Sequence, residues 1–129
     1  ERLIAYWIEN SERKKKTMQS LFRSRRYDDC LFFGHLILEC ALKALAVQKT
    51  HDDAPYTHNL LRLAHSVQIS LTPEEEQLLK EANEFNMEAR YPEEKFSFYQ
   101  QCTKSYVTPY YRRILLLYKQ LCQHIKQKK

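Results

Sequence analysis

Apolar residues recur along this chain at intervals of three and four, the spacing of one face of an α-helix. Over residues 3–22 this rhythm leaves most charged side chains elsewhere on the helical wheel. Over residues 28–48 almost every position is apolar or small, so a helix there is expected to be buried nearly all round. Residues 23–27 between them are few and mostly polar. The first two helices are therefore predicted to form an antiparallel hairpin at the centre of the fold.

Local capping signals predict two more helices. Residues 50–56 contain two aspartates and a proline and are expected to form the main loop. Thr57 follows this loop and is expected to cap a short third helix. Thr72, Pro73 and Glu75 combine a capping hydroxyl, a first-turn proline and a carboxylate three residues after the cap. This combination predicts the start of a fourth helix.

The C-terminal third of the chain predicts a break and then a final helix. Pro92 is expected to stop the fourth helix, because the residue before a proline disfavours helical backbone. Residues 96–99 are expected to form a short helical or irregular link. Thr108 followed by Pro109 again resembles a cap and a first-turn proline, so the last helix is predicted over residues 109–126.

The composition supports an all-α fold. A chain of 129 residues fits one domain, residues 1–129, and its single glycine and four prolines are too few for the turns that sheets require. We therefore predict an antiparallel up-and-down bundle of about five helices. The single glycine, Gly34, lies inside the second helix and is expected to let the first helix approach closely at Trp7.

The net charge of +5 leaves two interpretations open. Much of the excess lies in residues 13–16 and 126–129, which either form solvated helix faces and ends or attract partners that carry phosphate. Residues 115–118 form an apolar row that no single helix face can hide. This row predicts a homodimer, because an apolar surface of that kind calls for a partner.

The cysteines indicate a reducing compartment. Cys30, Cys40, Cys102 and Cys122 are far apart and form no Cys-x-x-Cys pair, so they are expected to be buried thiols of a cytoplasmic protein. Polar residues interrupt the apolar second helix within the length that a membrane span requires, so no membrane association is expected.

A polar stripe crosses the second helix and is the main candidate for chemistry. His35, Glu39 and Lys43 recur every four residues and therefore share one face of this otherwise apolar helix. Glu39 and Lys43 have the spacing and order of a favourable ion pair, and Asn86 and Arg90 are also four residues apart. These residues form either a buried polar network that fixes helix register or a cluster that faces a ligand.

Neither a metal site nor a cofactor site is expected. His51, His58 and His65 are spaced by seven residues, whereas zinc ligands on one helix are usually three or four apart. His58 is instead expected in the first turn of the third helix, hydrogen-bonded to a neighbouring helix. Gly34 is isolated, so the chain has no glycine-rich loop for phosphate.

The whole pattern resembles the HEPN domain, a small helical nucleotide-binding module. The resemblance depends on a tryptophan helix, a Phe-Phe segment followed by Glu and Lys-Ala, a Thr-His-x-Leu segment and Arg-Tyr-Pro. The matching positions are Trp7, Tyr27, Phe32, Phe33, Glu39, Ala41, Leu42, Lys43, Ala44, Thr57, His58, Leu60, Arg90, Tyr91 and Pro92. Two positions depart from the family pattern, since Lys14 and Asn59 stand where such domains often carry aspartate.

The resemblance implies a function as well as a fold. HEPN domains of this kind form dimers and resemble the partners of small nucleotidyltransferases in toxin–antitoxin-like pairs, and they associate with a nucleotide or RNA. Many HEPN domains are ribonucleases with an Arg and a His four to six residues apart on the last helix, a spacing that this chain lacks. The resemblance therefore points to the non-ribonuclease branch and to a protein that is not an enzyme. The candidate ligand-binding residues are His35, Glu39, Lys43, His58, Asn86, Arg90 and Tyr91.

The sequence leaves two alternative functions open. The chain could be a purely structural dimerisation or interaction module, in which the polar network serves packing alone. A ribonuclease toxin is the less favoured alternative, because in-line cleavage of RNA requires an acid or base beside a cation that steers the phosphate.

Overall fold

The computed structural model describes residues 2–88 and 91–127, and in this part of the chain it consists of α-helices joined by short turns and loops. The all-α prediction is confirmed. The helices are α1 (Arg2–Arg23), α2 (Tyr27–Thr50), α3 (Leu60–Ser66), α4 (Pro73–Glu88), α5 (Pro92–Gln101) and α6 (Lys104–Gln127).

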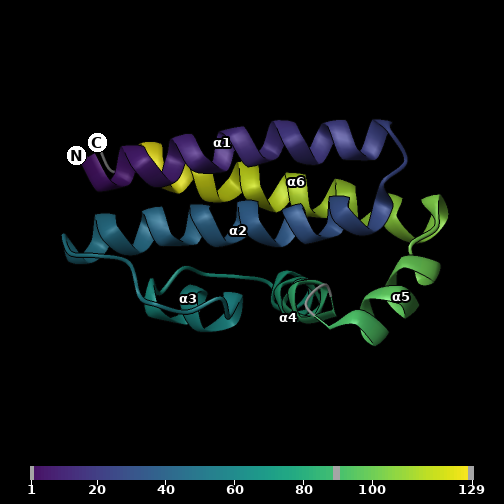
Figure 1. Cartoon of the computed structure of the whole chain (residues 1–129). Helices are drawn as coiled ribbons and strands as arrows, with labels where there is room; N and C mark the ends of the chain where they lie inside the picture. Colours follow the sequence, from purple (N-terminus) through teal and green to yellow (C-terminus); the bar gives the residue numbers. More distant parts are fainter. Residues whose placement is uncertain (1, 89–90, 128–129) are drawn as a thin grey trace.

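Helix α2 is the centre of the molecule. Helices α1 and α6 pack along one side of it, and α3, α4 and α5 lie on the other side (Figure 1). Fifteen residues of α2 are buried, which explains its almost continuous apolar sequence. By length and composition α2 could also cross a membrane, but 83% of its most apolar window is buried inside the bundle. Burial by the other helices accounts for this apolar sequence.

Gly34 is a close-packing point, and α1 approaches it as expected, but at Met18 and not at Trp7. A Cβ atom at this position would lie 2.9 Å from Cδ1 of Ile114 on α6 and 3.0 Å from Cε of Met18 on α1. Trp7 is not among these nearest neighbours. Its ring lies instead against Lys43, which is nine residues after Gly34 on α2. The missing side chain therefore lets α1 and α6 approach α2 at the same level.

The capping box of α4 is confirmed, whereas the expected cap of α3 is wrong. Thr72 Oγ1 accepts from the backbone N–H of Glu75 at 3.1 Å, and the Glu75 carboxylate accepts from the N–H of Thr72 at 2.9 Å. For α3 the cap is Asn59, whose Oδ1 accepts from the N–H of Arg62. The Thr57 hydroxyl accepts from the N–H of Asn59 instead, so it shapes the turn that leads into the helix.

The last helix begins earlier than predicted. It starts at Lys104, where the Thr103 hydroxyl accepts from the N–H of Tyr106. The Thr108 hydroxyl does not cap a helix but donates to the carbonyl of Lys104 at 2.6 Å. Pro109 lies inside the helix and has no N–H to donate to the carbonyl of Ser105, four residues earlier. Ser105 is exposed, so water can bond to this carbonyl in place of the missing N–H.

Helix α5 occupies the segment expected to be a link. Pro92 is its first residue, and Tyr91 before it has the extended backbone that a following proline favours, with φ −111° and ψ 129°. Helix α4 is described up to Glu88, so the exact place where it stops before Pro92 lies outside the described residues.

A hydrogen-bonded tyrosine joins the first and last helices. The Tyr118 hydroxyl donates to the Glu12 carboxylate at 2.6 Å and lies 2.8 Å from the hydroxyl of buried Ser11. Burial, and then the bond to Glu12, raises the pKa of Tyr118. Tyr118 and Leu117 are therefore buried in the bundle, and only Leu116 of the apolar row over residues 115–118 is strongly exposed, at 58%.

Three of the four cysteines are buried as expected. Cys30, Cys40 and Cys102 are enclosed, whereas Cys122 is half-buried, and none of the four forms a disulfide. Burial raises the pKa of Cys30 to about 12 and that of Cys40 to about 11. Both thiols are thereby kept neutral and unreactive at physiological pH.

Candidate ligand pocket beside a buried carboxylate network

The polar stripe of α2 forms a network around the Glu39 carboxylate. Lys43, one turn later on α2, donates from Nζ to Oε2 of Glu39 at 2.9 Å. His58, in the segment before α3, places Nδ1 at 3.2 Å and 3.1 Å from the two carboxylate oxygens. The Glu39 and Lys43 side chains are only 8% and 9% exposed. Burial of these two charges is therefore compensated by direct pairing.

The indole of Trp7 covers the ammonium group of this pair. Lys43 Nζ lies 5.2 Å from the ring centroid of Trp7 on α1. A cation over an indole ring is attracted to the electron-rich face of the ring. Helix α1 therefore shields the ion pair from solvent and contributes a second favourable contact to Lys43.

His35 fixes the backbone that carries His58. Its Nε2 lies 2.8 Å from the carbonyl oxygen of His58 and must donate, because a carbonyl can only accept. The other ring nitrogen of His35 lies 3.4 Å from the amide nitrogen of Asn86 and 3.6 Å from the Glu39 carboxylate. Since His35 is fully buried, it joins α2, α4 and the segment before α3 at one point.

These contacts also fix the orientation of the His58 ring. Nδ1 faces two carboxylate oxygens and therefore carries hydrogen, as in other carboxylate–histidine pairs. Nε2 lies on the opposite side of the ring, and the side chain is 60% exposed. His58 can therefore offer Nε2 to a ligand, as an acceptor when neutral and as a donor when protonated. The expected hydrogen bond to a neighbouring helix is confirmed, but His58 lies two residues before α3 and not in its first turn.

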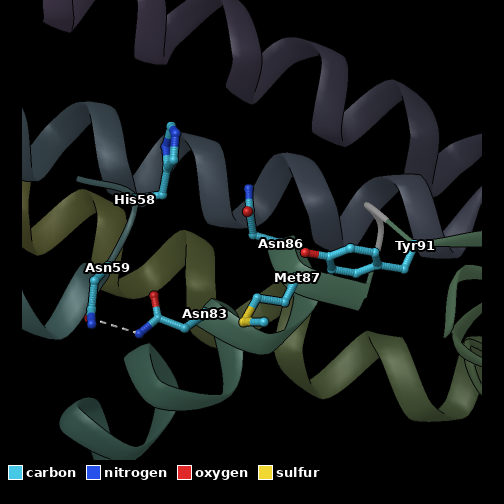
Figure 2. Close-up of a pocket in the computed structure, with 6 residues that line it drawn as sticks. All are labelled: His58, Asn59, Asn83, Asn86, Met87 and Tyr91. Carbon is cyan, nitrogen blue, oxygen red and sulfur yellow. Dashed lines mark hydrogen bonds between the residues drawn. The ribbon is translucent and has the colours of Figure 1, made fainter. Parts of the chain in front are cut away.

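A pocket of about 240 Å³ opens beside His58. Figure 2 shows the side chains of His58 and Asn86 pointing the same way, with the Tyr91 ring lying across the pocket and its hydroxyl directed towards Asn86. The lining residues are His58, Asn59, Asn83, Asn86, Met87 and Tyr91. Tyr91 and Met87 are exposed and provide an apolar rim.

Two of the asparagines that line the pocket, Asn59 and Asn83, use their side chains in hydrogen bonds that hold α3 and α4 together. Asn83 accepts from the backbone N–H of Leu60 at 2.8 Å, and its amide nitrogen donates to Asn59 (Figure 2). Asn59 in turn caps α3. Helix α4 thus determines where α3 begins. Asn86 is buried and its amide nitrogen contacts His35, so the groups most available to a ligand are those of His58, Met87 and Tyr91.

This arrangement suits a small planar ligand with polar edges. Such sites combine apolar or aromatic walls with a few polar groups that fix orientation. Tyr91 offers a ring face for stacking, and Asn86 and His58 offer hydrogen-bonding groups at one end of the pocket. In the part of the chain that the structure describes, no group of three or more His, Cys, Asp or Glu side chains could hold a metal ion.

The structure places the seven candidate ligand-binding residues predicted from the sequence in two groups, apart from Arg90. His58, Asn86 and Tyr91 line the pocket, whereas His35, Glu39 and Lys43 lie behind it as support. Arg90 lies outside the described residues. Sequence reasoning missed the other lining residues, Asn59, Asn83 and Met87. Two of them had a detectable signal: Asn59 directly follows His58 in the Thr-His-x-Leu segment, and Asn83 precedes Asn86 by three residues and therefore shares its helix face.

The fold and the pocket define a small all-α domain whose central helix carries a buried Glu–Lys–His network. A model of the HEPN domain family matches residues 4–119, which is most of the chain. The chain therefore belongs to the HEPN domain family. No curated protein and no solved structure gives a significant match to it.

Proposed function

We propose that this HEPN domain binds a nucleotide, either free or at an end of RNA, in the pocket beside His58. The observation that carries the proposal is the presence, in one pocket, of the exposed Tyr91 ring and an imidazole oriented by a buried carboxylate. A base stacked on an aromatic side chain gains about 1–3 kcal/mol. Asn86 would read the edge of the base, and His58 would meet a polar group of the sugar or phosphate.

We further propose that the protein acts without catalysis, as the partner of a small nucleotidyltransferase in a cytoplasmic, toxin–antitoxin-like pair. The ribonuclease spacing is lacking, since Arg113 and His124 on α6 are eleven residues, or about three turns, apart. We also propose that the protein forms a homodimer. Its candidate surface is the groove of about 630 Å³ between α1 and α6, which Leu115 and Leu116 line.

The nucleotide proposal is tested by calorimetric titration of the protein with each of the four nucleoside monophosphates. Tyr91→Leu keeps apolar volume but removes the stacking face, so it should weaken binding about tenfold. Tyr99→Leu is the matched control, because Tyr99 is an exposed tyrosine on α5 outside the pocket. If no nucleotide binds at millimolar concentration, or if both variants weaken binding equally, the proposal is wrong.

The alternative of a purely structural module also has an observation in its favour. Asn59 and Asn83 are already used to cap α3, and His35 and Glu39 tie three segments together. If the pocket serves packing alone, no nucleotide should bind in this titration, and His58→Gln should do no more than lower the melting temperature. The same titration therefore separates the two functions.

A further inference from the structure

The charges of this protein are divided between its two sides. Helices α4 and α5 contain six and two glutamates against one lysine each. Helices α1 and α6 contain six and five Lys or Arg residues, against two glutamates in α1 and no acidic residue in α6. Since α1 and α6 lie on one side of α2 and α4 and α5 on the other, the molecule has a basic side and an acidic side (Figure 1).

Helix α5, on the acidic side, is attached to the fold by a single buried side chain. Nine of its ten residues are exposed, and only Phe98 is buried, at 2% exposure, where it packs against Phe85 with ring centroids 5.6 Å apart. A helix of ten residues is too short to be stable without tertiary packing. Yet Phe96 and Tyr99 on α5 are 63% and 62% exposed. Helix α5 thus presents aromatic side chains for which the described chain provides no cover.

A hollow of about 430 Å³ lies between α5 and the start of α2. Its lining includes Phe32 of α2, Phe98 of α5 and the charged residues Asp28, Asp29 and Lys95. His58 and Asn86 line it as well, so this hollow adjoins the pocket described above. Phe96 and Tyr99 each follow a lining residue by one position, so they project from α5 about 100° round from the side that lines this hollow.

The carboxylates of this hollow are crowded. Burial raises the pKa of Asp29, and the neighbouring charge of Asp28 raises it further, while Lys95 and Arg26 act in the opposite direction. A cation brought by a partner would therefore find two adjacent carboxylates and an aromatic wall in Phe32, which are the groups that bind Lys and Arg side chains.

We infer that the α2–α5 surface, formed by Asp28, Asp29, Phe32, Phe96 and Tyr99, is a docking site for an apolar and basic segment of another protein. Exposed aromatic residues mark interaction surfaces, and the acidic surroundings select the charge of the partner. This inference does not depend on nucleotide binding in the pocket beside His58.

The charge distribution disfavours two other occupants. A run of RNA phosphates laid across the α2–α5 surface would be repelled by the carboxylates of Asp28 and Asp29. A second copy related by two-fold symmetry would place one acidic surface against another. A head-to-tail copy would match acidic to basic surfaces, but such contacts continue into rings or filaments.

The test is site-specific photo-crosslinking of the full chain in the cells that naturally produce it. A photoreactive phenylalanine at position 96 replaces an exposed ring, and the same group at Tyr6 on α1, an exposed ring on the other side of α2, is the matched control. We expect position 96 to crosslink a protein segment that is rich in Lys, Arg and apolar residues. The double substitution Asp28→Asn/Asp29→Asn should lower this yield at least threefold, and position 6 should not capture the segment.

Several results would overturn the inference. These are a crosslink from position 96 to RNA, to an acidic segment or to a second copy of this chain, no crosslink at all, or a yield that the two asparagine substitutions leave unchanged. Circular dichroism melting of each variant shows that the fold is intact. The affinity for the crosslinked segment, made as a synthetic peptide, should weaken at least tenfold with Phe96→Ser and stay unchanged with Tyr6→Ser.

Discussion

Removing one partner of the buried Glu39–Lys43 pair should destabilise the protein far more than removing both. The Nζ and Oε2 atoms are 2.9 Å apart, and both side chains are more than nine-tenths buried. Lys43→Met leaves the carboxylate with His58 as its main remaining partner, and Glu39→Gln leaves an ammonium group beneath Trp7. Loss of one partner of such a pair costs about 3 kcal/mol, because an uncompensated charge remains buried.

The double substitution should recover much of this loss. With Met at position 43 and Gln at position 39, no charge is buried, and the glutamine oxygen can still accept from His58. We expect the double variant to lose about 1–2 kcal/mol, well below the sum of the single losses of about 6 kcal/mol. For a domain of this size, each single variant should melt roughly 10 °C below the natural protein.

The assay is urea unfolding at pH 7, followed by circular dichroism, for the four members of this cycle. Lys80→Met is the matched control, since Lys80 is exposed on α4 and its removal should change the unfolding free energy by less than about 0.5 kcal/mol. Additive losses in the double variant would refute the reasoning. Single variants as stable as the Lys80 control would refute it as well.

Four further predictions address other parts of the molecule. Gly34→Ala should cost about 1 kcal/mol because its Cβ crowds Ile114, and the cost should vanish in an Ile114→Val background, which lacks the contacting Cδ1 atom; thermal unfolding of the four proteins measures this. The pKa of Cys30 is raised from 9.0 to about 12, so the folded state favours the neutral thiol, and this stability is complete below pH 9 and is lost as the pH rises towards 12. The unfolding free energy should accordingly fall by up to about 1.4 kcal/mol per pH unit above pH 9, and Cys30→Ala should make the fall less steep; equal slopes in urea titrations would contradict this. Sedimentation at micromolar concentration should show a dimer that Leu116→Glu dissociates, and a monomeric natural protein would count against the dimer. Single-stranded RNA should remain uncut without metal, and cleavage that is lost in His58→Ala would show that the protein is an enzyme after all.

Signals confined to a few neighbouring residues predicted much of the fold. The apolar run of α2 and the capping box of α4 depend on contacts within one or two helical turns, so the sequence contains nearly all the information that forms them. The same reasoning failed for α6. Thr108 followed by Pro109 has the local form of a helix start, but Thr103 five residues earlier begins the helix, and Pro109 is tolerated because its turn faces water.

The candidate site was only partly predictable, because its residues come from separate segments. The four-residue spacing of His35, Glu39 and Lys43 was enough to predict a network on α2. The spacing could not show that His58 completes the network or that Tyr91 closes the pocket, since those contacts depend on how α3, α4 and α5 pack. Asn59 illustrates the difference: the sequence marked it only as a departure from the family pattern, whereas in the fold its side-chain oxygen caps α3.

Because Phe98 is the one buried side chain of α5, the stability of this helix links the α2–α5 surface to the pocket beside His58. Tyr91 is both the residue that precedes α5 and a wall of the pocket, so an opening of α5 would also displace this wall. Segments with few buried contacts open at a low free-energy cost, well below that of global unfolding. A protein that clamps α5 would suppress these openings and hold the Tyr91 ring in place for a ligand. Each of the two binding events would then strengthen the other, with no change in the average structure.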